Sequence, residues 1–294
     1  MIGYRGDSNM PELPEVETVR RTLQRLVAGK TIQGVEVRLP RIVRRPAEPE
    51  AFVRTLEGST IRSVGRRGKF LIFDMDELLL VSHLRMEGRY GLYDAGAEIE
   101  QHTHVVFVFT DGTELRYRDV RQFGTMDVFR RDEIESAEPL RRLGLEPLDD
   151  AFTLSAFRAA IGSRTTKIKP LLLNQEVVVG IGNIYVDEAL HAAGIHPERT
   201  ADSLTRSELT RLHEAIVDTL KASVEAGGSS VKSYVNGQGE QGAYQFLLRA
   251  YGREGEPCGT CGAAIEKFVV GGRGTHICPR CQPAKRGGRK RKHT

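Results

Sequence analysis

The sequence predicts an α+β protein, in which an N-terminal helix plus a β-sandwich domain precedes a helical domain and a small cysteine module. Apolar residues follow a helical period near the start, then a period of two or short apolar runs to about residue 135. Helical periodicity dominates beyond that point, and all four cysteines lie between residues 258 and 281. A length of 294 residues favours two domains.

The first predicted helix covers residues 14–28, because its apolar residues share one helix face and Gly29 ends the pattern. These apolar residues are Val16, Val19, Leu23, Leu26 and Val27. Short apolar or alternating runs then predict strands at 32–39, 70–73, 78–84 and 105–109. Asp111-Gly112, between residues 105–109 and 115–117, is a strong hairpin signal.

The second half of the chain begins after a polar stretch at 130–138 and a turn at 144–147. Helical periodicity predicts helices at 154–161, 168–173, 185–193 and 207–224, and Gly227-Gly228 ends the last one. Residues 236–242 are expected to form a mobile loop. The predicted division is a leader at 1–9, domains at 10–135 and 136–250, a cysteine module at 251–282 and a basic disordered tail at 283–294.

The four cysteines form two Cys-x2-Cys pairs, Cys258 with Cys261 and Cys278 with Cys281. Two such knuckles give a tetrahedral thiolate cage, so we predict one structural Zn2+, against a redox dithiol or unrelated thiols. Four protein ligands leave no open position for catalysis. The segment between the knuckles, residues 265–277, reads as a two-stranded ribbon with Arg273 at its exposed tip.

Composition restricts the class of protein and says little about its partner. A hydrophobic content of 39% with 28% charged residues fits a soluble globular protein, and no apolar run is long enough to span a membrane. The net charge of +4 does not identify a polyanionic partner. The absence of cysteines outside the module predicts a cytoplasmic protein.

The stretch from Met10 to Glu17 carries the strongest chemical signal. If Met10 is the initiating residue and is removed, Pro11 has a free secondary amine that titrates near ~7.7–8.0. Such an amine forms a Schiff base with an aldehyde-level carbon, and Glu12 beside it is placed for proton transfer. Alternatively, Pro14 is simply the first residue of a helix whose early glutamates complement the helix dipole.

This octet, Met-Pro-Glu-Leu-Pro-Glu-Val-Glu, resembles the N-terminus of the bacterial formamidopyrimidine-DNA glycosylases, which excise oxidised purines. The resemblance implies that Pro11 is the Schiff-base nucleophile, Glu12 the acid and Glu15 a helper in the same pocket. The leader from Met1 to Asn9 would block this amine, and it has no apolar core typical of a signal peptide. We therefore expect the mature protein to lack it.

A second resemblance lies in the middle helices. Gly180-x-Gly182 before a helix can cradle a phosphate, and Asn183 can be a helix N-cap. The strings Ile-Lys-Pro-Leu-Leu-Leu and Gly-Ile-Gly-Asn-Ile-Tyr are similar to the family's helix–two-turn–helix element. That similarity implies that Lys169 and Asn183 bind the phosphates flanking the damaged nucleotide, and it includes Tyr185 in the DNA-binding element.

One position departs from the family. A basic residue commonly precedes the threonine that Thr166 matches, whereas this chain has Thr165 there. We therefore assign that DNA contact to Arg164.

Two basic residues are implied to assist the chemistry. Lys69 follows a basic turn, and the family match implies that it reaches the deoxyribose and phosphate near Pro11 and assists β-elimination. Gly-Arg-Gly-Thr before the second cysteine pair implies that Arg273 contacts the lesion's phosphate and aids the second elimination. Without the resemblance, both would be read as solvated surface residues.

The resemblance also implies residues that fill the stack after the damaged nucleotide has left it. Met86 would enter on the damaged strand, and Arg121 and Phe123 on the opposite strand. His102 matches a DNA-contacting position, whereas His104 is expected to be a structural strand residue. The family often has Pro and Arg where this chain has Val120 and Gln122, so one loop charge is missing.

The function so implied is a bifunctional DNA glycosylase and abasic-site lyase of base excision repair. The expected substrate is double-stranded DNA with oxidised purines (8-oxoguanine, formamidopyrimidines) or abasic sites, and the protein is expected to act as a monomer associated with the nucleoid. One alternative is an endonuclease-eight-like enzyme for oxidised pyrimidines, against which Leu13 argues because that branch usually has glycine there. The other is a non-catalytic zinc-ribbon protein that binds lesions, a reading that the leader favours.

Overall fold

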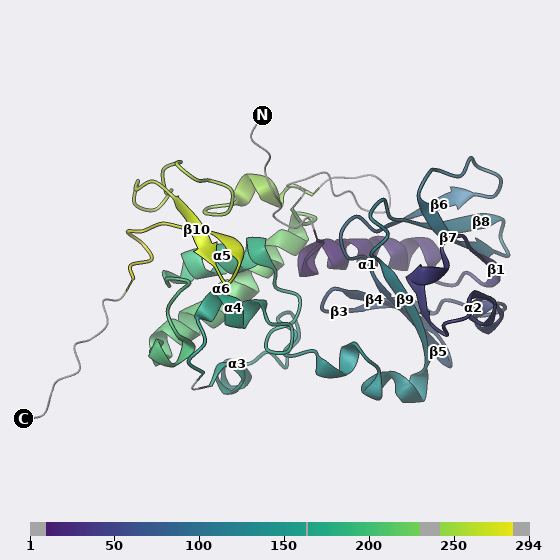
Figure 1. Ribbon diagram of the computed structural model, residues 1–294, viewed down its shortest axis with the longest axis horizontal. Helices are drawn as coiled ribbons and strands as arrows, with labels where there is room; N and C mark the ends of the chain where they lie inside the picture. Colours follow the sequence, from purple (N-terminus) through teal and green to yellow (C-terminus); the bar gives the residue numbers. More distant parts are fainter. Residues whose placement is uncertain (1–9, 163, 230–241, 285–294) are drawn as a thin grey trace, which may run out of the picture.

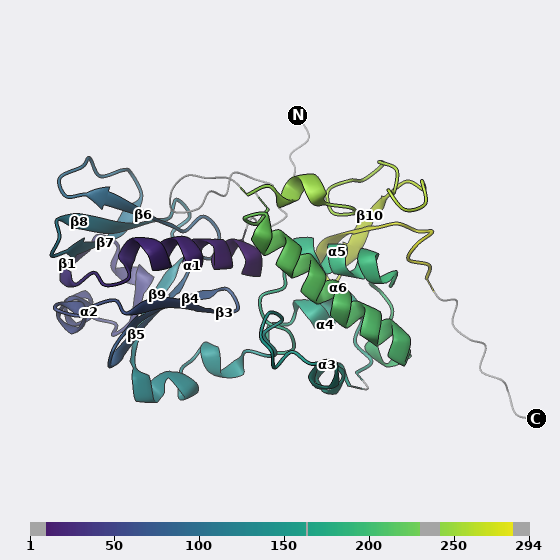
Figure 2. The same cartoon turned by 180° about the vertical axis from the view of Figure 1, so that it is seen from behind.

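The computed structural model describes residues 10–162, 164–229 and 242–284. The leader at 1–9, all but the last residue of the predicted loop at 236–242, and the basic tail from residue 285 lie outside the described residues. A strand-rich half and a helical half lie at opposite ends of the molecule, and helix α1 (Leu13–Val27) reaches from one to the other (Figures 1 and 2). The predicted α+β architecture is therefore confirmed.

Helix α1 starts with a reciprocal cap. The backbone N–H of Glu12 donates to Glu15 Oε2 at 2.9 Å, and Pro14 lies in the first turn, where its missing N–H costs nothing. The apolar face predicted from the sequence packs into the core of the sandwich through Val16, Val19, Leu23 and Val27. Leu13 is different, because it belongs to the core of the helical half. The first turn of α1 therefore joins the two halves.

The strand-rich half is a sandwich of two sheets. One sheet has the order β2 (Val43–Arg45), β9 (Thr125–Arg130), β5 (Leu78–His83), β4 (Phe70–Met75) and β3 (Ser63–Arg67). The other has the order β1 (Ile32–Val37), β7 (Thr103–Phe109), β8 (Thr113–Arg118) and β6 (Arg89–Asp94). Pairing is antiparallel except between β2 and β9. The turn between β7 and β8 contains the predicted Asp111-Gly112, with Gly112 at φ 80°.

Short elements complete this half. Helix α2 (Pro49–Leu56) buries Phe52 and Leu56 and packs against β1, after a 3-10 turn η1 (Pro40–Ile42). Strands β2, β3, β6 and β9 and helix α2 were not predicted from the sequence. Two 3-10 helices, η2 (Arg131–Ser136) and η3 (Leu140–Arg142), connect the sandwich to the helical half.

The helical half contains α3 (Leu154–Ile161), α4 (Ile168–Leu173), α5 (Asn183–Ala193) and α6 (Arg206–Glu225), with 3-10 turns η4 (Ala201–Ser203) and η5 (Tyr244–Leu247). The predicted helices are confirmed, α5 and α6 being slightly longer than expected. Helix α6 starts with a Thr205–Glu208 capping box, and α5 ends at Gly194 in the left-handed conformation. Helices α5 and α6 pack against each other around one apolar core.

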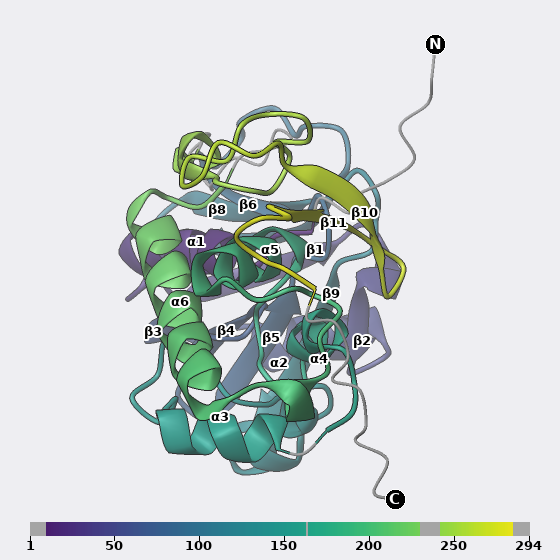
Figure 3. The ribbon, with the colours of Figure 1, turned by 90° about the vertical axis from the view of Figure 1, so that its left-hand side faces the viewer.

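The cysteine module contains the predicted ribbon, made of β10 (Glu266–Val270) and β11 (Arg273–Ile277). The turn between them is Gly271-Gly272, with φ values of 57° and 75° that favour glycine. Arg273 is therefore the first residue of β11, paired with Val270, and its predicted place at the tip was wrong by one position. The ribbon lies beside α5 (Figure 3). Within the described ranges, no helix has the length and apolar character needed to cross a bilayer.

Candidate functional site

A cavity of about 390 Å³ lies where the first turn of α1 meets the helical half. Both halves and the ribbon line it, and its polar residues include Glu12, Lys69, His83, Arg85, Asn183 and Arg273. Met10, which precedes the predicted nucleophile Pro11, lines it as well. The structure thus brings together five segments that are far apart in the sequence: residues 10–12, the β3–β4 turn, the end of β5 with the turn after it, the start of α5 and the ribbon.

Two glycines, Gly180 and Gly182, leave space for Glu12 and Leu13. A Cβ at Gly180 would lie 2.6 Å from Leu13 Cδ1, and a Cβ at Gly182 would lie 2.1 Å from Glu12 Cδ. Leu13 also donates its backbone N–H to the Gly180 carbonyl at 3.0 Å. The Gly-x-Gly motif therefore admits the first turn of α1. The anion that occupies the N-terminus of α5 is the carboxylate of Glu12, so the phosphate cradle suggested by the motif is not what the structure contains.

Glu12 is 5% exposed, and its carboxyl group accepts a hydrogen bond from the backbone N–H of Ile184 at 3.2 Å. Burial raises its pKa to about 7, against the opposing field of the Lys69 ammonium. Burial also lowers the pKa of Lys69, which Glu12 and Glu15 counteract. A carboxyl group with a pKa near neutrality, beside a buried amine, is suited to donating and accepting protons.

Glu15 contacts Glu12 but does not itself line the cavity. It accepts the Glu12 backbone N–H, the hydroxyl of Tyr185 and the backbone N–H of Ser229, the last at 2.7 Å. Burial raises the pKa of Glu15. The Tyr185 hydroxyl also accepts a hydrogen bond from Ser223, and the residue is 1% exposed. The prediction that Tyr185 contacts DNA was therefore wrong: its ring is core, and its hydroxyl fixes Glu15.

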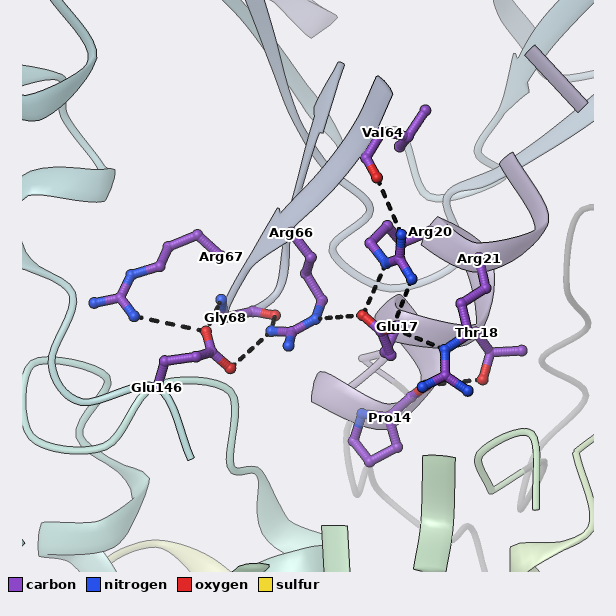
Figure 4. A network of polar contacts seen from close by, with 10 residues as sticks. All are labelled: Pro14, Glu17, Thr18, Arg20, Arg21, Val64, Arg66, Arg67, Gly68 and Glu146. Carbon is purple, nitrogen blue, oxygen red and sulfur yellow. Dashed lines mark hydrogen bonds and ion pairs between the residues drawn. The ribbon is translucent and has the colours of Figure 1, made fainter. Parts of the chain in front are cut away.

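The turn that carries Lys69 is fixed against the helical half. Gly68 has φ 56° and fits against Val179, and its N–H donates to Glu146 Oε2 at 2.8 Å. Arg66 bridges Glu146 and Glu17 at 2.9 and 3.1 Å (Figure 4). These contacts hold the turn between α1 and the segment that leads into the helical half, so that Lys69 faces the cavity.

Lys169 does not reach the surface, which contradicts its predicted role in phosphate binding. The side chain is 0% exposed, and its ammonium donates to Asp187 Oδ1 at 2.7 Å, Thr275 Oγ1 at 2.8 Å and the Gly274 carbonyl at 3.0 Å. Asp187 Oδ2 accepts the backbone N–H of His276. This buried ion pair ties the ribbon to α5.

Asn183 is the first residue of α5 and lines the cavity. Its side chain does not cap the helix, because Gly182 is the N-cap, so that alternative was wrong. The amide donates instead to the Gly274 carbonyl at 2.9 Å. Together with Lys169, it fixes the start of β11, so that Arg273 lines the cavity.

The loop that follows β8 presents the residues expected to enter DNA. Phe123 is 53% exposed, and the Arg121 guanidinium lies 5.2 Å from the centre of its ring. Fully buried Asp119 supports the loop from below, because its carboxylate accepts the backbone N–H groups of Arg121, Phe123 and Gly124 at 2.9 to 3.1 Å. An apolar tip on a rigid base is suited to wedging between bases.

The remaining predicted residues lie on the outside of the cavity. Met86 is half-buried in the turn after β5, and His102 precedes β7 with φ 67°. His104 is buried and its Nε2 lies 2.8 Å from the Asp119 carbonyl, which confirms a structural role. Arg164 is exposed and does not line the cavity.

Three polar residues of the cavity wall were not predicted from the sequence: His83, Arg85 and Gln175. His83 packs edge-on against Phe70 at 4.4 Å, and burial lowers its pKa to about 3. Its Nδ1 accepts the backbone N–H of Arg85 at 2.9 Å, so the ring is neutral at physiological pH. Nothing in the spacing of these residues in the sequence indicated a place in the cavity wall.

The four cysteines fit one zinc ion. Their Sγ atoms all lie within 4.8 Å of one another, and Cys261 and Cys278 are 3.3 Å apart. A tetrahedral Zn–S bond of about 2.3 Å sets neighbouring sulfurs about 3.8 Å apart, close to these separations. Gln282 supports the cage, since it accepts the Cys278 N–H and donates to the Ile195 carbonyl of the helical half. All four thiols are unpaired by disulfides, as the metal requires.

Family models match three parts of the chain. Residues 10–126 match the formamidopyrimidine-DNA glycosylase N-terminal domain, and residues 143–235 match the formamidopyrimidine-DNA glycosylase H2TH domain. Residues 255–284 match the zinc finger found in FPG and IleRS. The last match agrees with the cage of four cysteines. The zinc of this cage is structural, because four protein ligands fill its coordination shell.

Individual relatives cover nearly the whole chain. The formamidopyrimidine-DNA glycosylase of Brevibacillus brevis is 63% identical over 273 residues, which are 93% of this chain and 99% of that protein. That of Bacillus subtilis is 54% identical over 94% of this chain and all of its own length. The Lactococcus lactis Fpg solved with abasic-site DNA has a TM-score of 0.86 at 43% identity, covering 93% of this chain and 100% of that one. Three matched models in order along one chain and relatives of full length leave one assignment: this protein belongs to the formamidopyrimidine-DNA glycosylase family.

Proposed function

We propose that this protein is a bifunctional DNA glycosylase and abasic-site lyase that excises oxidised purines from duplex DNA. The observation that supports it best is the buried carboxyl group of Glu12, with a pKa of about 7, in a cavity shared with Lys69 and Arg273. The relatives are named formamidopyrimidine-DNA glycosylases, and solved Lactococcus lactis complexes contain abasic-site or Fapy-dG DNA. The substrate class is carried over from them.

The proposed chemistry starts with the secondary amine of Pro11. Its nitrogen attacks C1′ of the damaged nucleotide, and the bond to the base breaks with a proton delivered to the leaving base. Glu12 relays the proton that opens the sugar ring and leaves an iminium between Pro11 and C1′. The iminium withdraws electrons, so a proton is lost from C2′ and the 3′ phosphate leaves. A second elimination expels the 5′ phosphate and cuts the strand on both sides of the lesion.

Lys69 and Arg273 supply positive charge for this sequence. Both line the cavity with Glu12, so both are close enough to hold the phosphates that leave during elimination. Zinc has no role in these steps because its four protein ligands fill its coordination shell. Arg273 depends on zinc only through the ribbon that carries it.

DNA is proposed to contact the exposed residues of this face. Met86, Arg121 and Phe123 would fill the stack, and His102 and Arg164 would contact the backbone. Asn183 has a place at the cavity wall, where the backbone of the extruded nucleotide would pass. We also propose the division into domains at 10–135, 136–250 and 251–282, with the protein acting on the chromosomal DNA of the cytoplasm.

The mechanism requires Pro11 to be the first residue. The match to the N-terminal domain model starts at residue 10, so the leader lies outside it. The decisive test compares the chain that begins at Pro11 with the 294-residue chain on abasic duplex DNA in borohydride. The chain beginning at Pro11 should form a covalent adduct, and the longer chain should bind without forming one.

Two results would count against the proposal. Equal trapping of the two chains would exclude Pro11 as the nucleophile, and the absence of trapping or strand cleavage by either chain would favour a lesion-binding protein. Substrate choice is tested separately by comparing duplexes that contain 8-oxoguanine or thymine glycol. Faster cleavage of thymine glycol would favour the endonuclease-eight-like alternative.

A further inference from the structure

His191 contacts the zinc cage from outside the cysteine module. It lies in the last turn of α5, is buried, and has Nε2 3.5 Å from Cys258 Sγ. The two residues are separated by 67 positions in the sequence. A buried imidazole at this distance from sulfur is within the range of an N–H···S hydrogen bond.

His191 is not a fifth ligand. The ligand atoms that cluster for a metal are the four cysteine sulfurs, all within 4.8 Å of one another, and the imidazole is not among them. Cys258 is almost fully buried, so water has little access to its sulfur. In the described residues His191 Nδ1 has no hydrogen-bond partner. Nε2 is therefore the ring nitrogen that makes a polar contact, and that contact is with Cys258 Sγ.

The electrostatics of the cage favour a donor at this place. Zn2+ with four thiolates carries two net negative charges, and burying them costs free energy unless N–H groups point at the sulfurs. An imidazole N–H on Nε2 provides such a group, whereas a lone pair on Nε2 would face the lone pairs of the thiolate. Groups that contact metal ligands in this way commonly change metal affinity 10–100-fold.

We propose that His191 is a positioning residue for the zinc site: its Nε2–H donates to the Cys258 thiolate, stabilises the bound zinc and joins the cage to α5. The bond adds to other contacts between the module and the helical half, among them those of Gln282 with Ile195, of Lys169 with the ribbon and of Asn183 with Gly274. It differs from them because it acts on a metal ligand directly.

Zinc affinity tests the proposal without DNA or activity. His191→Phe keeps the ring volume and removes the donor, and His191→Gln restores an N–H at similar reach. In competition with a chromogenic zinc chelator, His191→Phe should bind zinc about 10-fold or more weakly, and His191→Gln should lie close to the wild type. His104→Phe is the matched control, because His104 is a buried, hydrogen-bonded histidine of the sandwich half.

A measurement on the unmutated protein removes the risk that a variant fails to fold. With cadmium-113 in place of zinc, the spin of the metal should couple through Cys258 Sγ to the ring proton of His191 and give a cross-peak between them. A missing cross-peak in folded, cadmium-loaded protein would overturn the proposal. So would unchanged zinc affinity in His191→Phe, or an equal loss in His104→Phe.

Discussion

Gly182 packs directly against the carboxyl group of Glu12. A Cβ at position 182 would lie 2.1 Å from Glu12 Cδ and 2.3 Å from Oε1, closer than any real contact. Gly182→Ala should therefore displace Glu12 and lower the rate of base excision by about 100-fold, as misplacement by about 1 Å can do. Single-turnover excision of 8-oxoguanine measures this rate. Gly34→Ala, with nothing within 4 Å of its Cβ, is the control and should not change it.

The charge of Glu12 makes stability depend on pH. Folding raises its pKa from 4.5 to about 7, so its stabilising contribution is complete below pH 4.5 and is lost as pH rises through 7. In the 294-residue chain, Glu12→Gln should remove this loss and raise the free energy of unfolding at pH 8 by about 3 kcal/mol. Urea denaturation at pH 5 and pH 8 measures the free energy of unfolding of both proteins. Exposed Glu254→Gln should behave like the wild type at both values.

Asp119 should control the loop that carries Phe123. Asp119→Ala leaves three backbone N–H groups of the loop without their acceptor, which should cost about 3 kcal/mol and weaken binding to lesion-containing duplex. Phe123→Ala should weaken binding as well, but with little effect on thermal stability because the ring is exposed. Thermal denaturation of these variants measures the effect on stability, and gel shift of the same variants measures the effect on DNA binding. A fully stable Asp119→Ala would contradict the scaffold role.

The pair of Lys169 and Asp187 should behave as a buried ion pair. Either Lys169→Met or Asp187→Asn leaves an unpaired buried group, and each should lower the free energy of unfolding by about 3–5 kcal/mol. The double variant should lose much less than the sum of the two. Lys167→Met, which breaks an exposed ion pair with Glu198, should cost less than about 1 kcal/mol.

The same variants test the phosphate role that the sequence suggested for Lys169. A lysine that binds phosphate contributes about one unit to the slope of log affinity against log salt concentration. Lys169→Met should leave that slope unchanged, since the ammonium is fully buried. A slope reduced by one unit would restore the phosphate role.

The sequence predicted elements whose signals are local. The Asp111-Gly112 hairpin, the helices of the second half and the cysteine knuckles each depend on residues close together in the chain, and all formed as expected. Helix α2 and strand β9 were missed, because α2 buries only Phe52 and Leu56 and the apolar residues of β9 are interrupted by a buried Asp127. Short elements of this kind are stabilised by partners elsewhere in the fold.

The errors at the site have one physical cause. Lys169 reads as a surface cation in its own neighbourhood, but its partners Asp187 and Thr275 are 18 and 106 residues away. Tyr185 reads as part of a DNA-binding motif, but it is buried against Glu15, 170 residues earlier. Pairings over such distances have no local signal. The resemblance to a family predicted that Glu12, Lys69 and Arg273 belong to one site, and all three line the cavity. Their spacing in the sequence could not predict this.

The cavity unites Glu12, near the start of the chain, with Arg273, close to its end. The ribosome must therefore release both segments before the pocket can exist. On the proposed function, a nascent chain that has not yet reached Arg273, or one clipped before it, would be unable to incise the genome, so strand cutting is confined to molecules in which the ribbon has formed.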